Sequence, residues 1–286
     1  MQYESPDTLE AASKLLASAS GDARILAGGT DLLVQMRAEV LTPALVIDIK
    51  RVAETRSIKE EAGGFRIGAA VTGAELKEHP KLKSVWPGLV EAANLIGSTQ
   101  VQGRATMGGN LCNGSPAADS VPALIAAGAV ATVVGPNGRR DIKVEDVMLA
   151  PRKLALTKGE IIASFLLPAR GAKASDAYLR FIPRTEMDIA VVGCGISLAL
   201  DAAGTCIAAR MSLGAVAARP LLVADAAKAL IGTKVDDAAL AKLEAAARAA
   251  CSPIDDKRGT KEFRIDVAGV LAKRTALIAL ERARKK

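Results

Sequence analysis

A glycine-rich stretch at residues 100–124, QVQGRATMGGNLCNGSPAADSVPAL, constrains this chain more than any other segment. It places Gly103, Gly108, Gly109 and Gly114 within a dozen residues, among short hydroxyl and amide side chains. Glycine tolerates positive φ and lets a ligand approach the backbone. The run is therefore predicted to expose several N–H groups on one concave surface, an arrangement that holds phosphate oxygens. An ordinary surface loop is the alternative, because Gly, Asn, Ser and Pro also mark turns.

A second glycine segment lies near the N-terminus. Residues 24–27 are typical of a short apolar strand, Gly28-Gly29-Thr30-Asp31 follows, and residues 32–36 resemble the first turns of a helix. A strand, a double glycine and a helix start place N–H groups where an anion can sit. The segment has neither the GxGxxG spacing of a Rossmann turn nor the Gly-Lys-Ser/Thr of a P-loop. Two such segments about eighty residues apart suit a ligand with a diphosphate in its middle.

The two motifs together carry a family resemblance. AGGTDLL at Ala27–Leu33 and TMGGNLCNGSPAAD at Thr106–Asp119 resemble the flavin signatures of the FAD-binding medium subunit of molybdenum hydroxylases. That family includes the CO dehydrogenase, xanthine dehydrogenase, nicotinate dehydrogenase and 4-hydroxybenzoyl-CoA reductase systems. The similarity covers nearly the whole chain. The chain lacks the extra cysteine-bearing cluster loop of the 4-hydroxybenzoyl-CoA reductase branch, and that branch is therefore less favoured.

The resemblance implies an α+β fold in two domains. Residues 1–172 would form a two-lobed FAD-binding domain of the PCMH or vanillyl-alcohol-oxidase type. Residues 176–286 would form a smaller C-terminal α+β domain of the CO dehydrogenase flavoprotein type. A short Ala/Gly/Lys stretch at 169–175 marks the boundary. Apolar periodicity and turn signals predict hairpins at 58–68 and 130–142, strands at 161–167, 189–200 and 206–216, and helices at 8–18, 87–96, 120–128, 221–231, 236–250 and 262–284.

Matching the family's motifs position by position assigns the cofactor-binding residues. The diphosphate is expected along Leu26, Ala27, Gly28, Gly29, Thr30, Asp31, Leu32 and Leu33, and along Thr106, Gly108, Gly109 and Asn110. Asp119 is expected to hydrogen-bond the cofactor, cap the following helix, or both. Ile96 and Ile162 fall where the family contacts the ring systems.

Arg180 departs from the family pattern. The family often has a lysine here in a Tyr-x-Lys sequence, whereas this chain has Tyr178-Leu179-Arg180. Arginine keeps the positive charge, but its planar guanidinium is not a compact ammonium donor. Arg180 is therefore a further candidate for the cofactor site. As the alternative, Arg180 and Arg184 would pair with Glu186 or Asp188 on the surface.

The resemblance also implies cofactors and partners. FAD would be the cofactor of this chain, with molybdopterin and [2Fe–2S] clusters only in a large and a small partner subunit, in a dimer of heterotrimers. Electrons would pass from the clusters through the flavin to NAD+, a quinone or oxygen. A free-standing flavin oxidase or dehydrogenase of the vanillyl-alcohol-oxidase fold, or a flavin-free interaction subunit, stays open. No residue is assigned a catalytic role, and His79 is expected in an exposed loop.

Charge and cysteine content argue against other classes. The formal charge of +7 is spread along the chain, and with 2% aromatic residues and no recognition motif, nucleic acid is not an expected partner. The chain has no apolar run of the ~18 residues that a membrane span needs. It shows no secretory signal, and the cytoplasm is the expected location. Four cysteines without C-x-x-C spacing indicate no metal or cluster site, and buried, inert thiols are expected.

Overall fold

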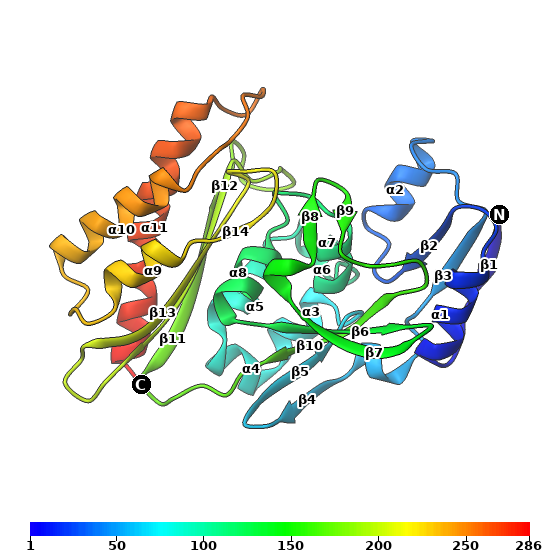
Figure 1. Cartoon of the computed structure of the whole chain (residues 1–286), viewed down its shortest axis with the longest axis horizontal. Helices are drawn as coiled ribbons and strands as arrows, with labels where there is room; N and C mark the ends of the chain where they lie inside the picture. Colours follow the sequence, from blue (N-terminus) through cyan, green and yellow to red (C-terminus); the bar gives the residue numbers. More distant parts are fainter.

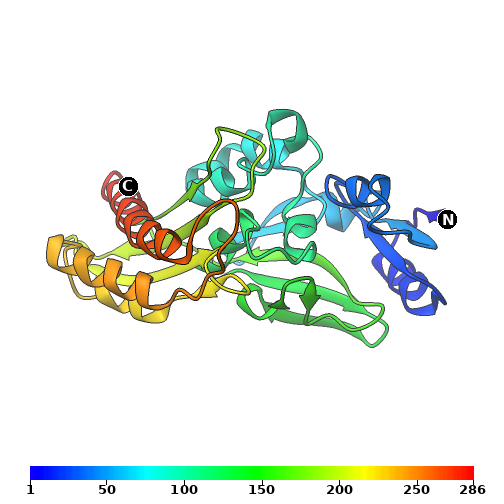
Figure 2. The same cartoon turned by 90° about the horizontal axis from the view of Figure 1, so that it is seen from above.

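The computed structural model describes residues 1–286 and arranges them as three parts in a row (Figure 1, Figure 2). A small lobe at the N-terminus adjoins a central sheet with helices, and a second sheet with helices follows at the C-terminal end. Strands pair in separate sheets, and most connections are hairpins or single helices. The predicted α+β class is therefore confirmed. No helix of the chain is both long enough and apolar enough to cross a bilayer.

The N-terminal lobe is a parallel three-stranded sheet in the order β1-β3-β2. Its elements are β1 (Gln2–Glu4), α1 (Leu9–Ser18), β2 (Ala23–Leu26), α2 (Leu32–Arg37) and β3 (Leu45–Asp48). Thr8 begins α1 because its hydroxyl accepts a hydrogen bond from the N–H of Ala11. Tyr3 fixes the edge strand by donating its hydroxyl to Asp48 at 2.7 Å. The segment after β2 therefore leaves the sheet at a defined point, and it carries the first glycine motif.

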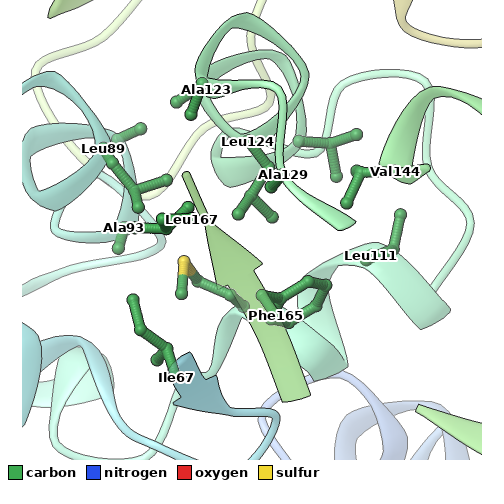
Figure 3. Packing of buried hydrophobic residues seen from close by; sticks show 14 of the residues in the cluster. Ile67, Leu89, Ala93, Leu111, Ala123, Leu124, Ala129, Val144, Phe165 and Leu167 are labelled. Carbon is green, nitrogen blue, oxygen red and sulfur yellow. The ribbon is translucent and has the colours of Figure 1, made fainter. Parts of the chain in front are cut away.

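The central part is a five-stranded antiparallel sheet in the order β4-β5-β10-β6-β7, and both predicted hairpins are present. Its strands and short helices are η1 (Ala53–Arg56), β4 (Ile58–Glu61), β5 (Gly64–Gly68), α3 (Gly73–Glu78), α4 (Pro80–Val85), α5 (Pro87–Ala93), α6 (Thr99–Gln102), α7 (Met107–Cys112), α8 (Ser120–Ala127), β6 (Val130–Gly135), β7 (Gly138–Lys143), η2 (Val144–Asp146), β8 (Met148–Ala150), β9 (Lys153–Leu154) and β10 (Ile161–Leu167). Figure 3 shows how the core forms: Phe165 of β10 lies beside Leu111 of α7 and below Leu124 of α8, and all three are fully buried. This packing fixes α7, which carries the second glycine motif.

His79 differs from its predicted role as an exposed loop residue. It is half-buried, its ring meets Phe65 edge-on, and its Nδ1 accepts the N–H of Leu82 at 3.1 Å. Pro80 is the first residue of α4, a position that suits proline because the first helical N–H has no intrahelical partner. His79 is thus a helix cap.

The C-terminal part is a four-stranded antiparallel sheet in the order β11-β12-β13-β14, covered by helices. Its elements are β11 (Ala174–Phe181), β12 (Val192–Leu200), β13 (Cys206–Gly214), β14 (Leu221–Leu222), α9 (Ala224–Leu230), α10 (Asp237–Ala249) and α11 (Lys261–Arg284). The sequence did not predict β11, whose first residues lie in the expected boundary stretch. The end of α11 contacts the central part, because the guanidinium of Arg282 pairs with Glu91 of α5.

Candidate functional site

A cleft of about 1190 Å³, measured out to its open mouth, separates the N-terminal lobe from the central part. One wall is the segment from Ala27 to Leu32, which joins β2 to α2. The opposite wall is α7 with its N-cap Thr106. The two glycine motifs, about eighty residues apart in the sequence, therefore face one shared space.

The first wall presents a row of unused backbone donors. The N–H groups of Gly28, Gly29, Thr30 and Asp31 donate no hydrogen bond within the chain. Backbone donors need a partner when water is excluded, and consecutive N–H groups of this kind bind phosphate oxygens. Burial raises the pKa of the Asp31 carboxyl, which makes protonation beside an anion easier. This wall fits the diphosphate of a dinucleotide.

Gly28 is required where the two walls meet at their closest. A Cβ on Gly28 would lie 1.9 Å from the carbonyl oxygen of Arg104, on the segment that leads into α7. Gly29 has a different role, since its φ of 81° is in the left-handed region that favours glycine. The double glycine therefore combines one close contact with one turn.

The second wall corrects part of the sequence prediction. Gly108 and Gly109 are helical, and their N–H groups are used inside the chain: Gly108 donates to the carbonyl of Ala69 at 3.2 Å and Gly109 to the hydroxyl of Thr106 at 3.0 Å. The prediction that these glycines expose N–H groups is wrong. Glycine is needed at 108 because a Cβ there would lie 2.5 Å from the oxygen of Ala69. Both glycines still line the cleft, where they present backbone without a side chain.

The structure brings together most of the predicted site residues. Twelve of them line the cleft: Ala27, Gly28, Gly29, Thr30, Asp31, Leu32, Ile96, Thr106, Gly108, Gly109, Asn110 and Ile162. Leu26, Leu33, Asp119 and Arg180 are not among the lining residues. Leu33 points to solvent and is 51% exposed. Leu26 packs beneath Gly29, where its Cδ1 would be 2.9 Å from an added Cβ.

Asp119 and Arg180 bind each other in a buried cluster between the central and C-terminal parts. Nη1 of Arg180 donates to Oδ2 of Asp119 at 2.7 Å, and the Tyr178 hydroxyl donates to Oδ1 at 3.1 Å. Burial outweighs both contacts and raises the pKa of Asp119 to about 6. Asp119 makes no helix-cap hydrogen bond. The surface pairing considered for Arg180 is also wrong, although Arg184 does pair with Asp188 at 3.2 Å.

Sequence reasoning missed more than half of the cleft lining. The additional residues are Leu16, Ala23, Arg24, Ile25, Gln35, Leu41, Ile49, Ala69, Ala105, Cys112, Asn113, Leu154, Leu156, Glu160 and Ile161. Several of them, including Ile25, Leu154 and Leu156, are aliphatic and suit the face of a flat ring. Glu160 is held ionised because hydrogen bonds from Arg140 lower its pKa to about 2. Only a few of them had a signal in the sequence: Cys112 and Asn113 lie within the second signature, and Ile161 adjoins Ile162.

The cysteines follow the prediction except at Cys112. Cys194 and Cys206 are buried and Cys251 is half-buried. Cys112 is solvent-exposed because its side chain opens into the cleft. Protein surrounds the thiol on its other sides, and this desolvation raises the pKa of Cys112 to about 12. The thiol is therefore accessible but weakly nucleophilic.

Comparison with known proteins places these features in a family. Residues 1–170 match the family model for the FAD binding domain in molybdopterin dehydrogenase, and residues 177–279 match the CO dehydrogenase flavoprotein C-terminal domain. The chain is 32% identical to the carbon monoxide dehydrogenase medium chain of Afipia carboxidovorans over 99% of this chain and 96% of that protein. It is 31% identical to the putative xanthine dehydrogenase FAD-binding subunit of Escherichia coli over 95% and 93% of the two chains.

Solved structures agree with the sequence matches. The chain superimposes on a chain of the carbon monoxide dehydrogenase from Hydrogenophaga pseudoflava with a TM-score of 0.94 and 33% identity, over 99% of this chain and 98% of that one. For a chain of quinoline 2-oxidoreductase from Pseudomonas putida 86, the TM-score is 0.90 with 27% identity, again over 99% and 98%. The similarity therefore covers all three parts of the chain.

Proposed function

Because the chain belongs to the family of FAD-binding subunits of molybdopterin dehydrogenases, we propose that it is the electron-transfer subunit of such a complex. It would take electrons from [2Fe–2S] clusters in a small partner subunit and pass them to NAD+, a quinone or oxygen. The observation that carries the proposal is the row of unused N–H groups from Gly28 to Asp31, facing the bare glycine surface of α7.

The residues of the cleft fit FAD. Flavin, when bound, supplies the redox chemistry, and the protein supplies binding, orientation and electrostatics. The N–H groups of residues 28–31 would hold the diphosphate, and Gly108 and Gly109 would let it approach α7. Ile96 and Ile162 would pack against the rings. We propose that Asp119 and Arg180 act on the cofactor through the wall of the cleft, since they lie behind it.

The assembly is proposed from the relatives. A large subunit with molybdopterin and a small subunit with two-iron clusters would complete the enzyme, as a dimer of heterotrimers. The substrate would then be selected by the large subunit. We also propose domain limits at residues 1–172 and 176–286, because the apolar core of the central part lies before that boundary except for Tyr178, and the core of the C-terminal part lies after it. Four free cysteines are consistent with a cytoplasmic location.

Flavin content and flavin reduction test the proposal. The chain would be co-expressed with its neighbouring subunits, purified gently, and scanned for flavin absorbance. We expect one FAD for each copy of this chain, and reduction of that FAD by substrate only when the large and small subunits are present. A complex without flavin would contradict the proposal and favour an interaction subunit. Substrate-dependent reduction in the isolated chain would favour a free-standing flavin enzyme.

A further inference from the structure

Two amide side chains join the opposite walls of the cleft. Nε2 of Gln35 donates to Oδ1 of Asn113 at 3.1 Å, across 78 positions of sequence. Gln35 lies in the second turn of α2, in the N-terminal lobe, whereas Asn113 is the C-cap of α7, in the central part. Both residues line the cleft. Gln35 lies outside the two glycine signatures, whereas Asn113 lies within the second one, four residues after Gly109. The hydrogen bond therefore connects the two lobes directly.

The backbones that carry these amides are held in place. The carbonyl of Gln35 accepts the N–H of Val40 at 2.9 Å, so the chain after α2 folds back onto it. On the other side, Gly114 follows Asn113 with a φ of 65°, and its carbonyl accepts the N–H of Arg152 at 2.8 Å. A Cβ on Gly114 would lie 2.8 Å from the Cα of Arg152, which leaves this corner little room to move. The two amides thus meet because their supports are fixed.

This contact is separate from the one at Gly28. Helices rise about 1.5 Å per residue, so Gln35 stands about 6 Å along the chain from Asp31 and Asn113 about 10 Å from Thr106. The two walls consequently touch at one place beside the unused N–H groups and at a second place one to two helical turns away. A ligand that binds both walls is held more firmly while both contacts keep the walls together. The contact at Gly28 is between backbones, so the amide pair is the easier one to open.

We propose that Gln35 and Asn113 form a clasp across the cleft that slows the release of the bound cofactor. The inference rests on the proposed FAD site and assigns these two residues a positioning role that the glycine motifs do not supply. A neutral hydrogen bond of this kind changes an equilibrium by about 3- to 10-fold. The clasp acts on release, so Gln35→Ala and Asn113→Ala should each raise the FAD dissociation rate by about that factor.

A variant in which the two amides are exchanged distinguishes a clasp from two side chains that bind FAD independently. In the double variant Gln35→Asn/Asn113→Gln the combined side-chain length is unchanged, so the pair can re-form although each residue is altered. If the amides instead bound FAD separately, the exchange would misplace both. The clasp therefore predicts that the exchanged variant releases FAD within about 2-fold of the wild-type rate, and that the double alanine variant is no faster than either single variant.

The measurement is flavin fluorescence recovery after dilution of the FAD-loaded full-length chain into cofactor-free buffer. Gln100→Ala is the matched control, because Gln100 is an exposed amide of the same region that does not line the cleft. Thermal unfolding of each cofactor-free variant verifies that it folds. The clasp would be overturned if the two alanine substitutions multiplied the FAD dissociation rate in the double variant and the exchanged variant did not restore it. It would also be overturned if neither alanine substitution changed that rate. A wild-type chain that takes up no FAD would overturn the proposed function and the clasp together.

Discussion

Replacing Gly28 by alanine tests the geometry of the cleft most directly, because this residue sets the distance between its walls. The added Cβ would lie 1.9 Å from the carbonyl oxygen of Arg104, about 1.5 Å less than the 3.4 Å of ordinary van der Waals contact. The obstacle is backbone, so rotation of a side chain cannot relieve it. The segment that carries the unused N–H groups must therefore move away from α7 by about that distance.

Both stability and cofactor affinity should respond to Gly28→Ala. Overpacking of this kind costs about 1–3 kcal/mol, and each kcal/mol lowers the Tm of a chain of this size by roughly 2–4 °C. A hydrogen bond to a charged group contributes about 1.5–3 kcal/mol, so losing the alignment of one N–H with the diphosphate should weaken FAD binding about 10- to 100-fold. Calorimetric unfolding and a titration monitored by flavin fluorescence measure the two effects.

Gly103→Ala is the control for this variant, because Gly103 lies one residue before Arg104 and has an ordinary φ of −65°. A Cβ there would meet only the carbonyl oxygen of Gln100, at a relaxed 3.9 Å. This substitution should leave FAD affinity unchanged and should not lower the Tm. If Gly28→Ala bound FAD within about 2-fold of wild type with the same Tm, the close contact between the walls would be wrong.

Three further predictions concern groups outside the glycine motifs. The pKa of Asp119 is raised to about 6, so its own contribution to stability should be largest below pH 4 and should fall by at most about 3 kcal/mol as pH rises from about 4 to 6. The difference in unfolding free energy between wild type and Asp119→Asn should therefore change with pH over this range in urea unfolding, and a constant difference would contradict the raised pKa. FAD should protect the Cys112 thiol from iodoacetamide, because Cys112 lines the cleft. Peptide mass spectrometry measures the labelling, and equal labelling with and without FAD would place the cofactor elsewhere. Arg170→Ala should lower the free energy of unfolding in urea by about 3–5 kcal/mol, because it leaves the buried carboxylate of Asp176 without its partner at 2.8 Å. A loss below about 1 kcal/mol would contradict the importance of this ion pair.

The sequence located both walls of the cleft but not the reason for glycine in each. The motif spacing correctly indicated that Gly28 and Gly108 line one site, because each segment follows or begins a regular element. Whether a glycine supplies positive φ or close approach depends on what lies opposite it. For Gly108 that neighbour is Ala69, on a different segment, and for Gly28 it is Arg104. Spacing within one motif carries no information about such partners.

The strand β11 illustrates a second limit of prediction from the sequence. Its burial would ordinarily appear as an apolar run, but Ser175 and Asp176 are among its buried residues. Asp176 tolerates burial because its carboxylate accepts hydrogen bonds from the Arg170 guanidinium and from the N–H of Leu89. Leu89 is distant in the sequence. A stretch that looks polar enough for a linker is therefore part of the sheet.

The buried ion pair suggests why the C-terminal part accompanies the cleft although none of its residues line it. Asn110, in the cleft wall, accepts hydrogen bonds from the N–H and the hydroxyl of Ser120 at 3.0 and 2.7 Å. Ser120 directly follows Asp119, whose carboxylate is held by Arg180 on β11. These contacts link the ligand-facing side of α7 to the second sheet in three steps. The C-terminal part thus supports the corner between α7 and α8 on the side away from the cleft. A loss of charge at Arg180 should therefore shift Asn110 more than the unused N–H groups on the opposite wall.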